Sequence, residues 1–336
     1  MKSLRILGPG KFELSEIAIP VPAQGELLLS PVVVGMCATD LELIDGSMVY
    51  LRNGLARFPF TPGHEWVARI DAVGDGVSNF SIGDLVVGEC SIGCGNCDLC
   101  LTGAYNRCLG RLETGVMNLD GALSESMLFP ADSAHLVPVG VRILDAVLVE
   151  PLAIAFRAIQ RSRVQKGESV LVVGAGSIGL LTIKLLVHAL GIPASIMEPN
   201  AFRLDRAEKF GAVGYKNGDL FTHVIEASGA PAGIAAAHGA LAAGGRLVLV
   251  GLTGQETVSL ATDEIVVKDQ EIIGSLGSPG VWPQVLELLA SAPINPSELV
   301  THHFPLTQIQ SAIDLAREKN PNTGKILIWP KEVLVD

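Results

Sequence analysis

The sequence predicts an α/β protein with a doubly wound parallel sheet in its second half and a compact β-rich domain in its first half. Residues 169–191 read SVLVVGAGSIGLLTIKLLVHALG, which is an apolar run, a glycine-rich turn and a second apolar run with helical spacing. Residues 4–129 are rich in short β-branched runs that Gly and Pro interrupt. A length of 336 residues suits two domains.

The glycine-rich turn follows a predicted buried strand, residues 170–173, and has the pattern Gly-x-Gly-x-x-Gly. Gly174 permits a tight turn, Gly176 lets a pyrophosphate approach the backbone, and Gly179 lets helix and strand pack closely. Ile178 completes the turn, and the N–H groups at the start of the helix face the phosphates. Strand, glycine turn and helix in this order predict a dinucleotide-binding Rossmann domain.

An acidic residue, Glu198, follows the next predicted strand, residues 194–197. Its side chain can accept hydrogen bonds from both ribose hydroxyls, and it repels a 2′-phosphate. We therefore expect NAD as the cofactor rather than NADP. The alternative for the whole stretch is an ordinary tight turn between a strand and a helix.

The other elements follow from apolar runs and their punctuation. In the first half, strands are expected at residues 17–20, 26–34, 65–73 and 84–87. In the second half, strands are expected at residues 221–227, 245–251, 272–276 and 324–328, and helices at 152–163, 200–209, 234–242 and 282–292.

Composition excludes several classes of partner. The formal net charge is −11, whereas nucleic acids and anionic membranes need clustered Lys and Arg. The longest apolar run, residues 180–190, contains Lys184 and His188 and is too short to span a bilayer. The apolar part of residues 1–10 is too short for a signal peptide. We expect a cytoplasmic enzyme with reduced cysteines, in which clustered cysteines indicate metal binding.

Four clustered cysteines have the spacing of a metal site: Cys94, Cys97, Cys100 and Cys108. Four thiolates in one loop can form a tetrahedron around Zn²⁺, and a closed all-sulfur set predicts a structural site. The alternative is four unrelated reduced thiols. Cys37 and His64 also lie in the first half, although a lone Cys or His is more often a core residue.

The order of these pieces resembles the zinc-dependent medium-chain dehydrogenase/reductase family, which includes alcohol, sorbitol and threonine dehydrogenases. The resemblance covers essentially the whole chain. Gly63-His64-Glu65 followed by Gly74 and Val77 is similar to the family's zinc signature, with Ala68 in place of the usual glycine. The resemblance implies a GroES-like catalytic domain at residues 1–147 and 283–336, a Rossmann domain at 148–282, and a homodimer or homotetramer. Residues 213–220 are too short for the helix that family members usually have there, so we expect a trimmed sheet edge.

The resemblance also implies a second, catalytic zinc held by Cys37 and His64. Glu65 and Glu150 are both candidates for a further ligand, either directly or through water. Glu150 stands where ethanol-type members carry a cysteine, and a glutamate there is similar to the polyol-dehydrogenase branch.

Three residues near Cys37 resemble the family's proton-handling groups. Thr39 resembles the residue that binds the substrate oxygen and passes its proton on. Asp40 resembles the residue that orients the zinc histidine, with a turn-capping aspartate as the alternative. Glu42 stands where many members have a relay histidine, so it is either a relay group or a solvated surface charge.

Further cofactor contacts lie after the predicted strands of the second half. Arg203 is expected near the adenosine ribose by resemblance, or is a surface arginine. The residues that should approach the cofactor are Gly251 and Leu252, and those that flank the nicotinamide by resemblance are Ser275, Leu276 and Gly277.

These features together indicate an NAD-linked dehydrogenase with two zinc ions per chain and a small-molecule alcohol or ketone substrate. It would oxidise a secondary alcohol to a ketone by hydride transfer. Polyols, amino polyols or cyclitols are favoured, including the aminocyclitol (2-deoxy-scyllo-inosamine) dehydrogenase branch. The alternatives are a zinc-independent NAD(P)H reductase of the same fold and a non-catalytic cofactor-binding scaffold.

Overall fold

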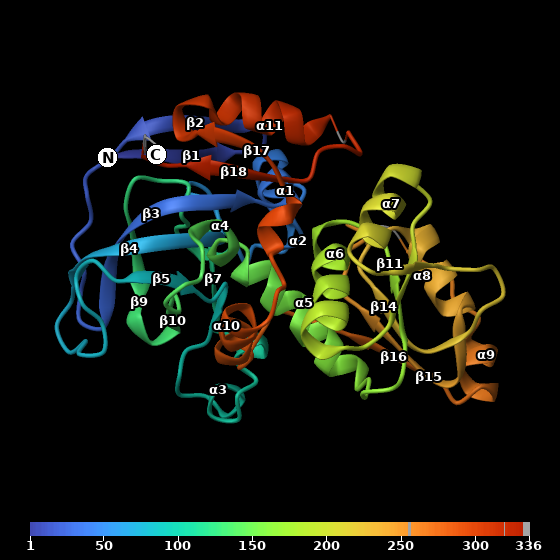
Figure 1. Ribbon diagram of the computed structural model, residues 1–336. Helices are drawn as coiled ribbons and strands as arrows, with labels where there is room; N and C mark the ends of the chain where they lie inside the picture. The colour runs from blue at the N-terminus through green and yellow to red at the C-terminus, as the bar shows by residue number, and fades with distance from the viewer. Residues whose placement is uncertain (255–256, 319, 332–336) are drawn as a thin grey trace. The chain divides into compact units, whose positions relative to one another are not determined.

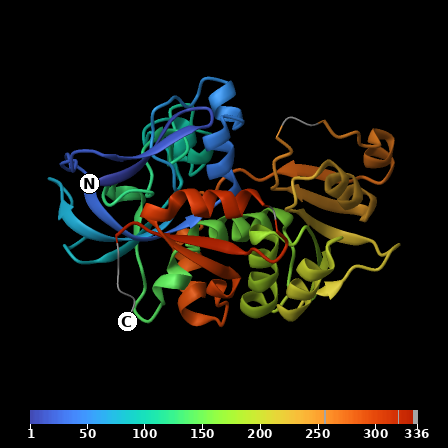
Figure 2. The same ribbon diagram turned by 90° about the horizontal axis from the view of Figure 1, so that it is seen from above.

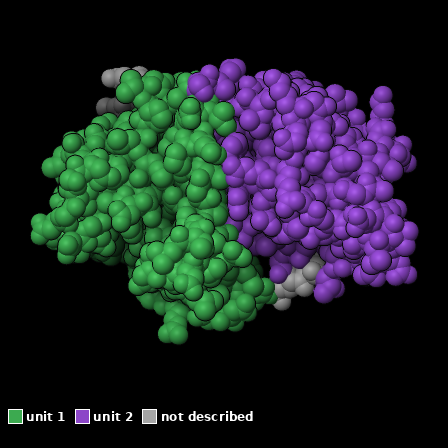
Figure 3. All heavy atoms as spheres, turned by 90° about the horizontal axis from the view of Figure 1, so that it is seen from below, with its two compact units in different colours: residues 1–150, 278–290, 300–336 green, residues 151–277, 291–299 purple. Residues whose placement is uncertain are grey.

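The computed structural model describes residues 1–254, 257–318 and 320–331, and the chain forms two compact units (Figures 1 and 3). Unit 1 comprises Met1–Glu150, Ser278–Ala290 and the described part of Val300–Asp336, and unit 2 comprises Pro151–Gly277 and Ser291–Leu299. The sequence placed the boundaries after residues 147 and 282. Residues 291–299 also pack with unit 2, because the buried Lys184 Nζ donates to Ile294 O at 3.0 Å and to Glu298 Oε2 at 2.6 Å.

Unit 2 is built around a six-stranded parallel sheet with the order β13-β12-β11-β14-β15-β16 (Figure 1). Its strands are β11 (Val170–Val173), β12 (Ala194–Met197), β13 (Val213–Gly214), β14 (Phe221–Glu226), β15 (Leu241–Leu249) and β16 (Glu271–Gly274). This order confirms the doubly wound Rossmann sheet. The strand order reverses between β11 and β14, where such sheets bind ligands beyond the carboxyl ends of their strands.

The helices of unit 2 pack on this sheet in the expected order. Helix α6 contacts β11, α7 contacts β12 and β13, and α8 contacts β11, β14 and β15. Their bounds, with those of α5 and α9, are Val149–Ser162 (α5), Ser177–Lys184 (α6), Ala201–Lys209 (α7), Pro231–Gly239 (α8) and Thr262–Val267 (α9). Helix α6 continues as a π-helix, Leu185–Leu190, and Gly191 ends it with φ 64°. No helix lies at residues 215–220, so the trimmed sheet edge is as predicted.

Unit 1 contains a larger mixed sheet with the order β10-β5-β4-β3-β18-β17, and β9 pairs with β3 (Figure 1). These strands are β3 (Glu26–Met36), β4 (Glu65–Val73), β5 (Leu85–Gly88), β9 (Met127–Pro130), β10 (Ala134–Leu136), β17 (Val300–Pro305) and β18 (Lys325–Trp329). Two smaller sheets join β1 (Lys2–Gly8) to β2 (Lys11–Glu16), and β6 (Ser91–Ile92) to β7 (Leu112–Thr114) and β8 (Asn118–Leu119). The β-rich first half is therefore confirmed.

The expected strand at residues 17–20 is wrong. Strand β2 ends at Glu16, and the following residues lie outside any strand. Pro20 has no N–H to donate to a ladder, and Ile19 is 59% exposed, so its side chain contributes little to a sheet face.

The helices of unit 1 are α1 (Ala38–Asp45), α2 (Val49–Arg52), α3 (Asp98–Leu101), α4 (Ile143–Ala146), α10 (Trp282–Ser291) and α11 (Ile309–Arg317). Helix α11 packs along β17, β18 and α1 (Figure 2). The register of the large sheet sets Gly35 opposite Glu65 and Met36 opposite Ile326. The end of β3 therefore meets the starts of β4 and β18, and α1 leaves from the same point.

Candidate metal centres and cofactor site

One group of possible metal ligands lies where β3, β4 and β18 meet. Cys37 follows β3 and is the N-cap of α1, whereas His64 and Glu65 lie at the start of β4. One ligand atom from each of these three residues lies within 4.8 Å of the others. Three donors from two segments at this spacing fit one metal ion.

Asp40 organises this group from a fully buried position. Its carboxylate accepts hydrogen bonds from Cys37 N at 2.8 Å and Gly63 N at 3.2 Å, and Oδ1 lies 3.6 Å from His64 Nδ1. Asp40 therefore caps the turn and also faces His64. It combines the turn-capping role and the histidine-orienting role that the sequence analysis gave as alternatives.

The His64 ring suits a metal ligand. Burial alone would lower its pKa, but Asp40 and the hydrogen-bonded Cys37 raise that pKa well above its ordinary value. Its Nδ1 is buried without a hydrogen-bond partner among the described residues. A metal on Nε2 would leave Nδ1–H directed at Asp40, as metal-ligating histidines usually are.

Lys325 is a member of this site that the sequence analysis missed. Its Nζ lies 2.7 Å from both carboxylate oxygens of Glu65 and 3.2 Å from Met36 O, and the side chains of this ion pair are 3% and 2% exposed. A Cβ on Gly35 would lie 2.3 Å from Glu65 Oε2, so only glycine leaves room for this carboxylate. The sequence feature that could have identified Lys325 was a lysine at the start of the otherwise apolar strand KILIW.

Glu150 lies in the first turn of α5 and is also buried. Burial raises its pKa to about 7, against the opposing effect of His64. The 4.8 Å group includes Glu65 and not Glu150. In the described part of the chain, the Glu150 carboxylate makes no hydrogen bond of its own, so it is free to face an ion near His64.

The other predicted catalytic residues lie on α1. Thr39 is half-buried in the first turn, two residues after Cys37. Glu42 is half-buried too. Burial raises the pKa of Glu42, and Arg52 opposes that rise.

The four clustered cysteines form a second metal group. The Sγ–Sγ distances are 3.9 Å for Cys94–Cys100, 3.6 Å for Cys97–Cys100 and 3.7 Å for Cys97–Cys108. A tetrahedron with Zn–S bonds of about 2.3 Å has sulfur atoms about 3.8 Å apart, whereas a disulfide needs about 2.05 Å. The spacing therefore fits a zinc ion and no disulfide.

In unit 2, the three glycines of the turn between β11 and α6 have distinct environments. Gly174 has φ 94°, and a Cβ there would lie 2.7 Å from the Ser228 Cβ. A Cβ on Gly179 would lie 1.9 Å from Gly174 O, so helix and strand pack as closely as predicted. Nothing lies within 4 Å of a Cβ on Gly176, which leaves open space where a pyrophosphate is expected. Ile178 lies in the first turn of α6.

Glu198 follows β12 and contacts the glycine turn directly. Its carboxylate accepts hydrogen bonds from Ala175 N at 2.8 Å and Asn200 N at 2.9 Å. Asn200 caps α7 by accepting from Arg203 N at 3.1 Å, and Arg203 itself is half-buried on that helix. The predicted ribose-binding residues thus lie together at the carboxyl end of β12.

The other predicted cofactor residues follow β15 and β16. A Cβ on Gly251 would lie 2.2 Å from Gly229 N, and Leu252 is 67% exposed. The Ser275 hydroxyl is buried without a partner among the described residues, Leu276 is exposed, and Gly277 has φ 59°.

Glu226 at the end of β14 is a second residue that the sequence analysis missed. It is fully buried and accepts hydrogen bonds from the Ser228 hydroxyl, Ser228 N and Gly229 N. It holds the turn that lies against Gly174 and Gly251. The sequence feature that could have identified Glu226 was an acidic residue at the end of a predicted buried strand.

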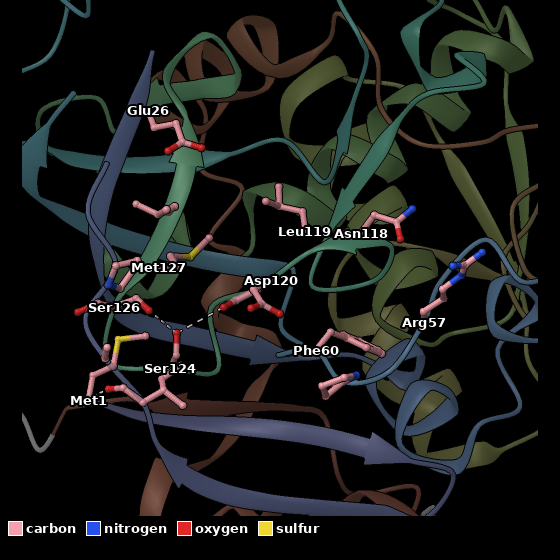
Figure 4. Close-up of a pocket in the computed structure, with 16 residues that line it drawn as sticks. Met1, Glu26, Arg57, Phe60, Asn118, Leu119, Asp120, Ser124, Ser126 and Met127 are labelled. Atoms are coloured by element: carbon pink, nitrogen blue, oxygen red, sulfur yellow. Dashed lines mark hydrogen bonds between the residues drawn. The ribbon is translucent and has the colours of Figure 1, made fainter. Parts of the chain in front are cut away.

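A separate pocket of about 460 Å³ lies in unit 1 (Figure 4). Met1, Glu26, Phe60 and Met127 line it, with Ser124, whose hydroxyl donates to Ser126 O at 2.7 Å. None of the candidate metal or cofactor residues lines this pocket. Each helix in the described part of the chain is too short or too polar to span a bilayer.

The fold and both metal groups define a class, the zinc-dependent nicotinamide dehydrogenases. Family models agree: the alcohol dehydrogenase GroES-like domain matches residues 23–139, and the glucose dehydrogenase C-terminus matches residues 144–320. The chain belongs to the zinc-dependent medium-chain dehydrogenase/reductase family. It is therefore an NAD(P)-dependent oxidoreductase that acts on CH–OH groups.

Individual relatives are similar over nearly their whole length. Sorbitol dehydrogenase of Bacillus subtilis is 27% identical, with 98% of this chain and 97% of the relative covered. Sorbitol dehydrogenase of Homo sapiens is 31% identical, with 93% and 91% covered. A solved alcohol dehydrogenase of Escherichia coli CFT073, complexed with NADH, has a TM-score of 0.90 and 28% identity and covers 98% of this chain and 99% of its own.

Proposed function

We propose that this protein is an NAD-dependent dehydrogenase that oxidises a secondary hydroxyl of a polyol, amino polyol or cyclitol to a ketone. The single observation that carries the proposal is the group of Cys37, His64 and Glu65, with Glu150 buried beside it. Sorbitol dehydrogenases among the relatives support a polyol as the substrate.

Cys37 and His64 would hold the catalytic zinc, with Glu65 or Glu150 as the carboxylate partner. Bound zinc supplies Lewis-acid chemistry, which lowers the pKa of an alcohol as it does that of water. Asp40 would orient His64, and Lys325 would balance the charge of the buried Glu65. Cys94, Cys97, Cys100 and Cys108 would hold the structural zinc.

Thr39 would bind the substrate hydroxyl and accept its proton. Its place on the first turn of α1, two residues from Cys37, supports this role. Glu42, one turn further along α1, would take the proton onward, and its burial keeps its pKa raised and suits a proton acceptor.

The cofactor would lie along the carboxyl ends of the unit 2 strands. The pyrophosphate would bind at the glycine turn, at Gly174, Gly176, Ile178 and Gly179. The adenosine ribose would bind at Glu198 and Arg203. Glu198 favours NAD because its charge repels a 2′-phosphate. The nicotinamide, which would accept the hydride, would be surrounded by residues that follow β15 and β16: Gly251, Leu252, Ser275, Leu276 and Gly277.

We also propose a cytoplasmic homodimer or homotetramer, with unit 1 as the catalytic domain and unit 2 as the cofactor domain. Strand β16 is the last strand of its sheet, and an edge strand can pair with a second copy.

The test is NAD(P)H formation by absorbance with primary alcohols, simple secondary alcohols, threonine, sugar polyols and aminocyclitols. Each is assayed with NAD and with NADP, before and after treatment with a zinc chelator. We expect a chelator-sensitive rate on polyols or amino polyols that is at least about tenfold higher with NAD. A rate that survives loss of the zinc would instead indicate the zinc-independent reductase. No rate from protein that holds only one zinc ion would indicate that reductase or the non-catalytic scaffold.

A further inference from the structure

A hydrogen-bonded network in unit 1 joins the cysteine loop, residues 94–108, to residues 278–282. The Tyr105 hydroxyl donates to Glu89 Oε2 at 2.5 Å and accepts from Gly280 N at 2.7 Å. His135 Nε2 lies 3.0 Å from Glu89 Oε1, and the His135 and Glu89 side chains are 20% and 12% exposed. Each carboxylate oxygen of Glu89 therefore has a partner, and the mechanism above uses none of these residues.

The cysteine loop determines where Tyr105 lies. Tyr105 stands between two of the proposed zinc ligands, Cys100 and Cys108, and its carbonyl accepts from Cys108 N at 3.0 Å. A Cβ on Gly93 would lie 2.5 Å from Cys100 Sγ and 2.6 Å from Tyr105 Cβ, so only glycine leaves room for this packing. Coordination by the four thiolates would fix the loop, and Tyr105 with it.

The segment that Tyr105 contacts is also held by Trp282. The Trp282 side chain is buried and its ring stacks on His135, with the ring centroids 5.5 Å apart and the planes at 10°. Trp282 Nε1 donates to Ser278 Oγ at 3.1 Å, which joins the two ends of the segment. Gly280 lies midway between them with φ 70°, and Tyr105 holds it from outside the segment.

This segment begins where the proposed nicotinamide site ends. Ser278 directly follows residues 275–277, which the proposed function sets beside the nicotinamide. Ser275 N donates to Leu249 O at 2.9 Å, which holds the start of that stretch against the sheet of unit 2. The end of the stretch continues into Ser278, so its conformation depends on how residues 278–282 are held.

We propose that Tyr105 and Glu89 are positioning residues for the nicotinamide. Through Gly280 they hold residues 278–282, and this keeps residues 275–277 in the conformation that receives the cofactor. A site that is held ready loses less conformational entropy when its ligand binds. The cysteine loop therefore serves cofactor binding as well as its own stability. This inference rests on the proposed function, which sets residues 275–277 beside the nicotinamide.

The experiment compares the zinc-loaded wild type with Tyr105→Phe, which removes the hydroxyl and keeps the ring. Calorimetry measures the affinities for NADH and for ADP-ribose, which lacks the nicotinamide. Because Gly280 N and Glu89 Oε2 lose their partner, Tyr105→Phe should weaken NADH at least about fivefold and leave ADP-ribose within about twofold. Amide hydrogen exchange should become at least about tenfold faster in a peptide that contains Gly280. The zinc content should equal that of the wild type.

Tyr215→Phe is the matched control, because the Tyr215 hydroxyl also accepts from a glycine, Gly218 N at 3.3 Å, but lies in unit 2. It should leave the ratio of the NADH and ADP-ribose affinities unchanged. Glu89→Gln is a second variant outside the cysteine loop, since its amide has one acceptor oxygen where the carboxylate has two. It should shift that ratio in the same direction as Tyr105→Phe.

Two results would overturn the inference while polyol turnover by the wild type leaves the proposed function intact. The first is equal weakening of NADH and ADP-ribose in Tyr105→Phe and Glu89→Gln, which would show a general effect on the fold. The second is faster exchange at Gly280 with unchanged NADH affinity, which would show that the network has no part in cofactor binding. A wild type that does not bind NADH would contradict both proposals.

Discussion

At the scale of single residues, buried charge pairing decides what the metal group can do. Glu65 belongs to the group by distance, yet Lys325 contacts both of its carboxylate oxygens. Taking a lone carboxylate out of water is far more costly than burying it with a partner. Lys325 therefore compensates the charge of the buried Glu65 and holds its carboxylate in place beside Cys37 and His64.

Lys325→Met should therefore destabilise the protein strongly. The variant leaves Glu65 as an unpaired buried carboxylate, and removal of one member of a buried pair costs about 3–5 kcal/mol. Urea denaturation of the metal-loaded protein measures the effect.

The surface pair Lys268–Glu264 supplies the control, since its side chains are 42% and 51% exposed. Lys268→Met should cost no more than about 0.5 kcal/mol, because solvent screens an exposed pair. Equal stabilities for Lys325→Met and Lys268→Met would show that the Lys325 pair has no special role.

At the scale of elements, the strand, glycine turn and helix in unit 2 do what the sequence predicts, and the reason is local. Gly179 packs against Gly174 O, five residues earlier, whereas Gly174 has a positive φ and packs against Ser228, and Gly176 faces open space. The helix itself departs from the prediction only in geometry, because it becomes a π-helix at Leu185. Apolar periodicity does not distinguish a π-helical turn from an α-helical one.

Two glycine substitutions separate packing from cofactor binding. Gly179→Ala places a Cβ 1.9 Å from Gly174 O and should lower both stability, by about 1–3 kcal/mol, and NADH affinity. Gly176→Ala meets nothing within 4 Å, so it should leave the unfolding free energy within about 0.5 kcal/mol and still weaken NADH at least about tenfold. Denaturation and NADH fluorescence titration measure the two effects. Unchanged NADH affinity in Gly176→Ala would contradict the assigned pyrophosphate site.

At the scale of the whole molecule, the sequence could predict features whose signal is contiguous. The four cysteines lie in one loop and the cofactor turn in one segment, so spacing alone indicates their chemistry. The Glu65–Lys325 pair could not be predicted this way, because 260 positions separate its members and only the β4-β3-β18 order brings them together. The same holds for residues 291–299, whose place in unit 2 depends on the buried Lys184.

The catalytic site was predictable only in part for the same reason. Taken singly, Cys37 and His64 have the sequence context of ordinary core residues. Only the family resemblance indicated that they share one metal site. The resemblance could not supply Lys325 or Glu226, since each shows only as a charge at the end of an apolar strand.

The central claim is that unit 1 holds two separate zinc sites, one of them catalytic. The most direct test is the zinc content per chain of the wild type, Cys37→Ser and Cys97→Ser, with polyol turnover and NADH binding measured on the same samples. We expect two zinc ions in the wild type and one in each variant. Cys37→Ser should lose turnover yet bind NADH with unchanged affinity, because Cys37 lies in unit 1 and the proposed NADH site lies in unit 2. Two zinc ions and normal turnover in Cys37→Ser would contradict the claim.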